Sequence, residues 1–508
     1  MKRIRYISLI LMTLISSACT TVATPKSNTI SVPIPTTNAI ISPATTSTTT
    51  PTIITPVTTI AATTTTATPL TTSTIAPTTA VPTVTLPKTT TTSYAAFNFS
   101  NVIFGTSSLS AFVQTMDPTT GTVLINGLDT RQPTIPFTFD WGDGTVRNSF
   151  FLCTHTYSDT TKNYTLTVTA HYSGGTTSSC KCVVFFVSPM VTPVALPDDI
   201  KVTIPNTAVS LATRMPYIPP SSLTVFNDSC FTIVPRSTAE YVLSVAASIQ
   251  KNFVNDNVYM VDGGFNQVVL SDPNASGMYS LWYTNQVALG AGTYAFQGTF
   301  QWSSLFHEMG HNMTLNSPAN FYYGGNIDGC ANAIFSETMA QIFQHATAYC
   351  LVNNYQTYGL NEDLATDIAD SSLSSMQIVK NEYESYIAGG KQFASWNDPA
   401  TPQDETFNTF MTIAYVFFEH AETSPLGYTT SLKRMMTLLD LFDARMAAQY
   451  DPSDNTAAAA TFRSTLMVTA LSYAFEQDLR PEFRNLNFPI DDQTYDELYQ
   501  KASSVTGQ

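Results

Sequence analysis

The strongest constraint on folding is a long low-complexity stretch from Thr20 to about Ser93. Thr, Pro, Ala, Ser and Val dominate it, charged side chains are almost absent, and it contains no aromatic residue. Such a composition cannot bury enough apolar surface to offset the entropy lost on ordering. It is typical of stalks that hold a folded domain away from a surface and favour extended backbone. We therefore assign residues 20–93 as a disordered stalk and look for folded domains downstream.

Charge and hydrophobicity place the globular part after this stalk. No acidic residue precedes Asp117 and no glutamate precedes Glu240, so the formal net charge of −15 belongs to the downstream chain. With 43% hydrophobic residues, that part can bury a large core. An acidic chain without a Lys/Arg cluster beyond its first five residues cannot neutralise a run of phosphates, which excludes nucleic acid as a partner.

The first 19 residues are typical of a secretory signal peptide. Lys2, Arg3 and Arg5 form a positive region, and the apolar stretch from Ile7 to Ile15 is too short to span a bilayer. It ends in Ser16-Ser17-Ala18-Cys19, which resembles a bacterial lipobox. The sequence predicts export, either as an envelope or surface lipoprotein anchored through Cys19 or, after ordinary cleavage near Ala18, as a secreted protein. Contact with a membrane is expected only through this anchor.

The remaining cysteines suit an oxidising compartment. Of the seven cysteines, six are left when Cys19 is set aside, an even number that predicts disulfides. Proximity in the sequence suggests pairing of Cys153 with Cys180 or Cys182, and of Cys330 with Cys350. Connectivity cannot be deduced from spacing alone.

Residues 94–188 show short alternating strands separated by turn residues, which favours an all-β sandwich. Within them, Phe139-Asp-Trp-Gly-Asp-Gly-Thr145 followed by His155-Thr-Tyr157 resembles the polycystic-kidney-disease (PKD) repeat, a module that serves as a spacer or contacts glycans and proteins. Asp143-Gly144 would supply a tight turn. For Asp140 and Asp143 we favour a turn-stabilising role over a calcium or ligand contact.

Residues 197–508 are typical of an α/β (α+β) domain with a mainly helical C-terminal half. A helix is predicted over 238–253, and extended segments over 258–261, 267–270 and 279–283. Later helices are predicted near 302–314, 331–352, 362–388, 404–422, 428–448 and 456–478, with prolines between several of them. The expected fold class is therefore multidomain, with a β-sandwich followed by this α/β domain.

One motif carries strong chemical content, His307-Glu308-Met309-Gly310-His311. On a helix, residues four apart project from the same face, so His307 and His311 can present two imidazoles to one Zn²⁺. Glu308 beside them can take a proton from an attacking water and deliver it to a leaving amine. The alternative is a pair of ordinary helix histidines.

A catalytic zinc site needs a third protein ligand, with a further position left for water. The metzincin pattern would require a Gly three residues and a His six residues after His311, where this chain has Thr314 and Ser317. A Glu on a later helix is the other solution, and Glu337 is the only glutamate between Glu308 and Glu362. We assign Glu337 as the third ligand, with Asp328 and His345 as competitors.

These residues resemble the gluzincin metallopeptidases. Trp302, the His307–His311 motif with Asn312 after it, and a Glu 26 positions beyond His311 are similar to the enhancin-like branch, which cleaves mucins and other glycoproteins. The likeness covers about residues 290–344. It implies a zincin-like fold, zinc ligation by His307, His311 and Glu337, and catalysis by Glu308. It departs from that branch at Ser303, where Gly is usual, and in the segment after Glu337.

A peptidase also needs a group that stabilises the developing oxyanion, usually Tyr or His. The sequence offers Tyr322, Tyr323, Tyr415 and His420. We select Tyr323, in a Gly-rich loop that could edge a cleft, and Tyr415, for which ordinary core packing is the alternative.

The leading hypothesis is thus a zinc-dependent peptidase, an endopeptidase, that hydrolyses extracellular proteins or glycoproteins. An exopeptidase with the same catalytic residues is the nearest enzyme alternative. A surface adhesion protein, in which the sandwich binds a partner and the zincin-like domain is an inert scaffold, is the competing non-enzyme class.

Overall fold

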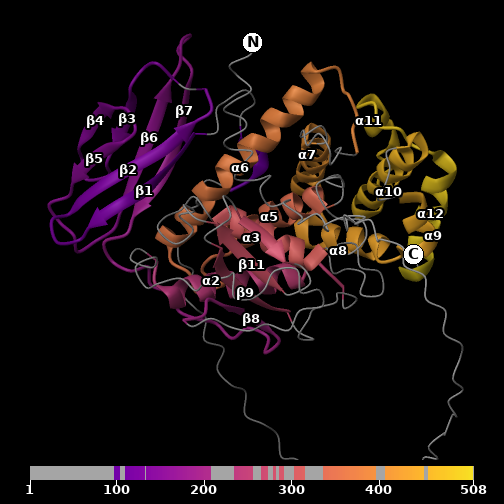
Figure 1. Ribbon diagram of the computed structural model, residues 1–508, viewed down its shortest axis with the longest axis horizontal. Coiled ribbons are helices and arrows are strands. Elements are labelled where there is room, and N and C mark those ends of the chain that lie inside the picture. Colours follow the sequence, from indigo (N-terminus) through magenta and orange to yellow (C-terminus); the bar gives the residue numbers. More distant parts are fainter. Residues whose placement is uncertain are drawn as a thin grey trace, which may run out of the picture. The chain divides into compact units, whose positions relative to one another are not determined.

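The structure is a computed structural model that describes residues 97–102, 109–131, 133–206, 234–255, 265–272, 278–281, 285–290, 302–314, 336–395, 407–450 and 456–506. All of them belong to one compact unit (Figure 1). They contain both sheets and helices, which confirms a mixed α/β class for the chain. Outside the described residues lie the predicted signal peptide (1–19) with Cys19, the stalk (20–93), Cys230, Tyr322, Tyr323, Asp328 and Cys330.

Residues 109–184 form two antiparallel sheets. The first has the order β1 (Leu109–Asp117), β2 (Thr122–Asp129) and β5 (Cys153–Thr156). The second has the order β4 (Val146–Ser149), β3 (Phe137–Asp140), β6 (Tyr164–His171) and β7 (Thr177–Val184). Buried and half-exposed residues alternate along β6, as expected for a strand with one face on a core. The predicted strand periodicity of this region is confirmed.

The turn after β3 is held by its own side chains. Trp141 is fully buried and stacks on His155, with 4.4 Å between ring centroids. Asp140 accepts a hydrogen bond from the Gly142 amide (3.2 Å), and Asp143 accepts one from the Thr145 amide (2.9 Å). Gly142 has φ +74°, and a Cβ there would lie 2.5 Å from the carbonyl oxygen of Thr165, so glycine is required. Both aspartates thus serve the turn, the role favoured for them.

The predicted disulfide of the sandwich is wrong. The thiols of Cys153, Cys180 and Cys182 are all free and buried. Cys153 lies on β5 in the three-stranded sheet, whereas Cys180 and Cys182 lie on β7 in the other sheet. Burial holds the pKa of both β7 thiols well above the usual value. Cys350 is also free, and Cys330, the partner suggested for it, lies outside the described residues.

A second sheet region begins the α/β part. Its order is β10 (Met278–Leu281), β11 (Gln286–Gly290), β9 (Phe265–Asp272) and β8 (Ile200–Thr203). β8 and β11 both pair with β9 in parallel, and β10 pairs with β11 antiparallel. Helix α2 (Arg236–Lys251) packs beside β8, where Ser244 accepts a hydrogen bond from the Val202 amide at 3.0 Å. β8 and β11 were not predicted, and predicted strand 258–261 lies outside the described residues.

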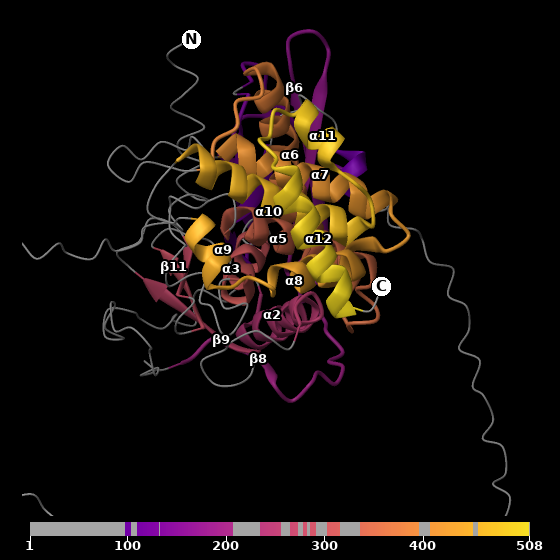
Figure 2. The same ribbon diagram turned by 90° about the vertical axis from the view of Figure 1, so that its right-hand side faces the viewer.

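The remaining chain is helical. Its described helices are α3 (Trp302–Thr314), α5 (Ser336–Asn353), α6 (Glu362–Ala388), α7 (Phe407–Thr423), α8 (Gly427–Leu439), α9 (Ala444–Tyr450), α10 (Ala457–Phe475), α11 (Arg480–Asn485) and α12 (Asp492–Thr506). The single helix predicted over 428–448 is two helices, because the Asp443 side chain caps α9 by accepting from the Met446 amide. α10 lies beside α8 and α12 (Figure 2). Most of its side chains are buried. Within the described ranges, no helix has the length and apolar character needed to cross a bilayer.

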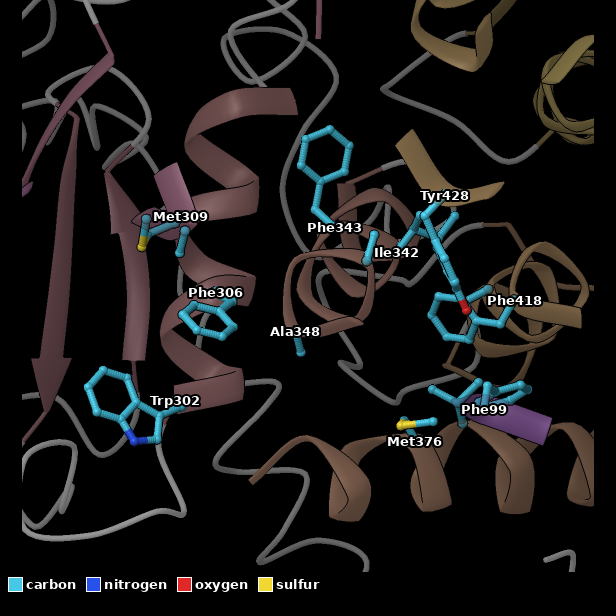
Figure 3. Packing of buried hydrophobic residues seen from close by; sticks show 14 of the residues in the cluster. Phe99, Trp302, Phe306, Met309, Ile342, Phe343, Ala348, Met376, Phe418 and Tyr428 are labelled. Atoms are coloured by element: carbon cyan, nitrogen blue, oxygen red, sulfur yellow. The ribbon is translucent and has the colours of Figure 1, made fainter. Parts of the chain in front are cut away.

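Apolar side chains from α3 and α5 form the centre of the helical core. Trp302, Phe306 and Met309 line α3, while Ile342 and Phe343 extend from α5 (Figure 3). All five are fully buried. These two helices carry the predicted metal ligands, and they approach each other where Gly310 faces Phe343 and Ala340.

Candidate metal centre

Helix α3 presents its two histidines to the same place. His307 and His311 are one helical turn apart, and their ring centroids lie 4.8 Å from each other. Both side chains are nearly fully buried. The apolar residues predicted to bury this helix, Leu305 and Met313 among them, are fully buried. The sequence therefore places both imidazoles on one turn, and the core then fixes the direction in which they point.

The first turn of α5 adds a carboxylate to this pair. Glu337 Oε2 lies 3.2 Å from His307 Nε2, and Glu337 Oε1 lies 3.5 Å from His311 Nε2. One ligand atom from each of the three residues lies within 4.8 Å of the others. Among the residues that the structure describes, this is the one such group able to hold a metal ion. Two nitrogens and a carboxylate oxygen form the donor set of many catalytic zinc sites.

Glu337 keeps its negative charge in this buried position. Burial alone would raise the pKa of Glu337, but the adjacent His311 and His307 hold it well below the usual value. A carboxylate that is ionised in a buried position needs positive charge beside it. Two imidazoles, which bind metals as neutral rings, together with a dication, satisfy that requirement. Zn²⁺ fits the residues present.

Glu308, next to His307 on α3, has a carboxyl oxygen that no other protein group occupies. Its side chain is 2% exposed, and its Oε2 atom has no hydrogen-bond partner. Burial raises the pKa of the Glu308 carboxyl to about 8, while His307 opposes the shift and Glu337 adds to it. A buried carboxyl with an unoccupied oxygen can accept a proton from a water molecule at this position. A dication beside it would lower the same pKa and favour the basic form.

Gly310, inside the motif, lets α3 and α5 approach closely. A Cβ at this position would lie 3.0 Å from Phe343 Cβ and 3.5 Å from the α carbon of Ala340. Glycine usually weakens a helix interior, so its presence here is explained by this contact. The distance between the histidines of α3 and Glu337 of α5 depends on it.

Replacing Gly310 with valine should therefore destabilise the protein and weaken metal binding. Overpacking of this kind costs about 1–3 kcal/mol. Alanine is the control, since its higher helix propensity, worth about 1 kcal/mol, offsets its smaller clash. Thermal denaturation followed by circular dichroism, with zinc content measured on the same samples, should rank wild type and Gly310→Ala above Gly310→Val. A valine variant as stable and as metal-rich as wild type would contradict the close-approach explanation.

Polar contacts that were not foreseen position α3 at both ends. At its start, Trp302 Nε1 donates to the Asp367 carboxylate on α6 at 2.7 Å. At its end, Asn312 Nδ2 donates to Gln267 Oε1 on β9 (3.1 Å), and Asn312 Oδ1 accepts from Ser280 Oγ on β10 (2.5 Å). Asn312-Met313-Thr314 has the form of an N-glycosylation sequon, but Asn312 is fully buried, which leaves no room for a glycan. Asp367 stands among apolar residues of α6, and this is the one sequence signal that could have indicated its contact with Trp302.

The competitor His345 lies elsewhere in the described structure. Its Nε2 atom is 3.1 Å from the Tyr428 hydroxyl and 3.9 Å from Glu422. The structure thus brings Glu337 to the two imidazoles, while His345, on the same helix, contacts α7 and α8. Asp328, the other competitor, lies outside the described residues. Zinc ligation by His307, His311 and Glu337 stays a prediction.

Of the four candidate oxyanion stabilisers, the structure describes Tyr415 and His420. Tyr415 is buried on α7, its hydroxyl donates to Glu419, and its ring stacks on Tyr383 at 3.8 Å between centroids. These contacts match the core packing that was its alternative role. His420 lies 2.9 Å from Glu482. Tyr322 and Tyr323 lie outside the described residues.

Comparison with known proteins gives no assignment: no family model, no curated protein and no solved structure matches the chain. Any function must therefore be argued from the buried group on α3 and α5.

Proposed function

We propose that this chain is a zinc-dependent peptidase that hydrolyses peptide bonds of extracellular proteins. The observation that carries the proposal is the convergence of His307, His311 and Glu337, with their ligand atoms within 4.8 Å of one another, beside the buried carboxyl of Glu308. A pair of ordinary helix histidines would not require a buried carboxylate from another helix at the same point.

The residues have distinct roles in this proposal. His307, His311 and Glu337 would hold the ion, and a bound Zn²⁺ supplies Lewis-acid chemistry that activates water near neutral pH. Glu308 accepts the proton of the attacking water and then donates it to the nitrogen of the leaving amine. Its unoccupied Oε2 atom supports this role, because that oxygen is not engaged with another protein group. Tyr323 remains the proposed oxyanion stabiliser, whereas the contacts of Tyr415 with Glu419 and Tyr383 favour its alternative role in core packing.

The finer fold assignment belongs to the same proposal. Residues 94–188 would be a PKD-like module and residues 197–508 a zincin-like peptidase domain of the gluzincin type. The turn held by Asp143 and Trp141 supports the first assignment, and the helix pair α3 and α5 supports the second. Export through residues 1–19, with a lipid anchor at Cys19 or as a secreted protein, would give the enzyme access to extracellular proteins and glycoproteins.

Metal removal gives a direct test. A peptide library digested by the full chain should yield cleavage products that disappear after treatment with a chelator and return after addition of Zn²⁺. Products with new ends inside the peptides would identify an endopeptidase, and stepwise loss from one end an exopeptidase. A surface adhesion protein would bind its partner without hydrolysis. Absence of cleavage by zinc-loaded protein across the library would count against the peptidase.

A further inference from the structure

A short segment before the sandwich is held by the helical part of the chain. Residues 97–102 follow the predicted stalk in the sequence and fall inside the predicted sandwich domain (94–188), yet Phe99 packs against α7. The segment contains a single 3₁₀ turn, η2 (Phe99–Asn101), which Asn98 caps by accepting from the Asn101 amide at 3.0 Å. Its partners on the helices lie more than 250 positions later in the chain.

Two aromatic side chains anchor this segment. Phe99 is fully buried, with its ring 5.0 Å from that of Phe418 and 5.4 Å from that of Tyr415, between centroids. Phe97 is 4% exposed and lies 5.8 Å from the His345 ring. Figure 3 shows Phe99 between Phe418 and the helix that carries Met376. Buried aromatic anchors of this kind dominate the energy of most peptide and protein interfaces.

Charged groups hold both ends of the turn. The amides of Phe99 and Ser100 donate to the Glu422 carboxylate on α7, the second at 2.8 Å. At the other end, the Lys380 ammonium on α6 donates to the Val102 carbonyl, and it lies 4.8 Å from the centroid of the Phe99 ring. Such charge-assisted bonds to main-chain groups are stronger than neutral ones. They also recognise backbone, and so do not depend on the side chain of Ser100.

Helices α5 and α8 contribute the remaining contacts around residues 97–102. Asn353 Nδ2 donates to the Phe97 carbonyl at 3.0 Å, and Tyr428 on α8 donates to Glu422 at 3.2 Å. The groups that hold the segment are therefore aromatic rings for its phenylalanines, a carboxylate for its amides, and an ammonium and a carboxamide for its carbonyls. None of these groups belongs to the metal centre.

We infer that the surface formed by α5, α6 and α7 is a peptide-binding site for an aromatic–Asn–aromatic turn, and that residues 97–102 occupy it as a built-in ligand. The contacts are those of a bound peptide: two buried anchors two positions apart, and main-chain groups held at both ends. The occupant packs on α5, the helix whose first turn carries Glu337. The site is independent of the proposed catalysis, because its residues are distinct from His307, Glu308, His311 and Glu337.

A binding experiment tests the inference. The double variant Phe97→Ala/Phe99→Ala should vacate the site in the full chain, and Phe150→Ala, at an exposed sandwich position, is the matched control. A fluorescent peptide of residues 97–102 with blocked ends should bind the vacated variant at least tenfold more tightly than wild type or the control. The same peptide with both phenylalanines replaced by alanine should bind none of them. Equal affinity for all proteins, or no binding to a vacated variant that keeps its helical circular dichroism, would overturn the inference.

A second variant covers the case in which the double variant does not fold. Glu422→Gln keeps the side-chain shape but removes the charge that holds the Phe99 and Ser100 amides. Hydrogen exchange in the peptide containing residues 97–102 should become at least tenfold faster, while Glu497→Gln, at an exposed position on α12, should leave it unchanged. Exchange equal to wild type in Glu422→Gln would show that the segment is not held as argued.

Discussion

Glu337→Ala is expected to remove most of the bound zinc while the chain stays folded. Glu337 is the only carboxylate in the three-residue group, and both of its oxygens face an imidazole nitrogen, at 3.2 and 3.5 Å. Loss of a partner outside the coordination shell already costs about 10–100-fold in metal affinity. Loss of a ligand should cost at least about 100-fold. Zinc content by mass spectrometry after dialysis against a competing chelator measures the effect.

A matched control separates ligation from helix stability. Glu337 lies in the first turn of α5 and Glu362 in the first turn of α6, where each carboxylate favours its helix electrostatically. Glu362 is exposed, so Glu362→Ala should lose that small helix contribution and keep the zinc. If Glu337→Ala retains the same zinc stoichiometry as Glu362→Ala, the third ligand must be sought elsewhere, with Asp328 and His345 as the next candidates.

Helix ends could be predicted where local signals mark them. α6 occupies the predicted range 362–388, because Asn361 caps its start by accepting from the Leu364 amide and Gly389 and Gly390 follow its end. The break between α8 and α9 carries no Gly or Pro, and one aspartate cap was not enough to reveal it. α12 was missed although Tyr495, Leu498 and Ala502 are buried at helical spacing, a signal that its many polar residues obscured.

Contacts between distant segments were the part that could not be predicted. His307 and His311 share one helical turn, so their spacing alone predicts that they meet. Glu337 required a choice among acidic residues, and the reason that it meets the histidines is the close approach of α3 and α5 at Gly310. No sequence pattern indicates that Phe99 would pack beside Glu422, which lies 323 positions later in the chain. Similarly, pairing of cysteines by sequence proximity failed, because closeness in the sequence does not bring two side chains together: Cys153 and the two cysteines of β7 lie on strands of different sheets, and all three thiols are free.

Glu308→Gln should abolish peptide hydrolysis and leave zinc binding intact. Glutamine has nearly the same volume and keeps a polar group at this buried position, so the packing of α3 should not change. It cannot accept the proton of the attacking water, and positioned proton transfer contributes about 10²–10⁴-fold to rate. The turnover number of zinc-loaded protein on a peptide identified by library digestion should fall by at least that factor. Zinc content should equal that of wild type, because His307, His311 and Glu337 remain.

Comparing the loss of activity with the loss of zinc and stability in Glu308→Gln distinguishes a catalytic role of Glu308 from a structural one. If Glu308 acts only by supporting the fold, Glu308→Gln should lower the denaturation midpoint and zinc content together with activity. If it transfers the proton, activity alone should fall, and a peptide substrate should still bind the zinc-loaded variant with unchanged affinity, since the general base contributes to the transition state rather than to the ground state. Glu337→Ala should show the opposite pattern, with activity falling in proportion to zinc. Cleavage by Glu308→Gln at the wild-type rate, with zinc bound, would exclude this glutamate as the base.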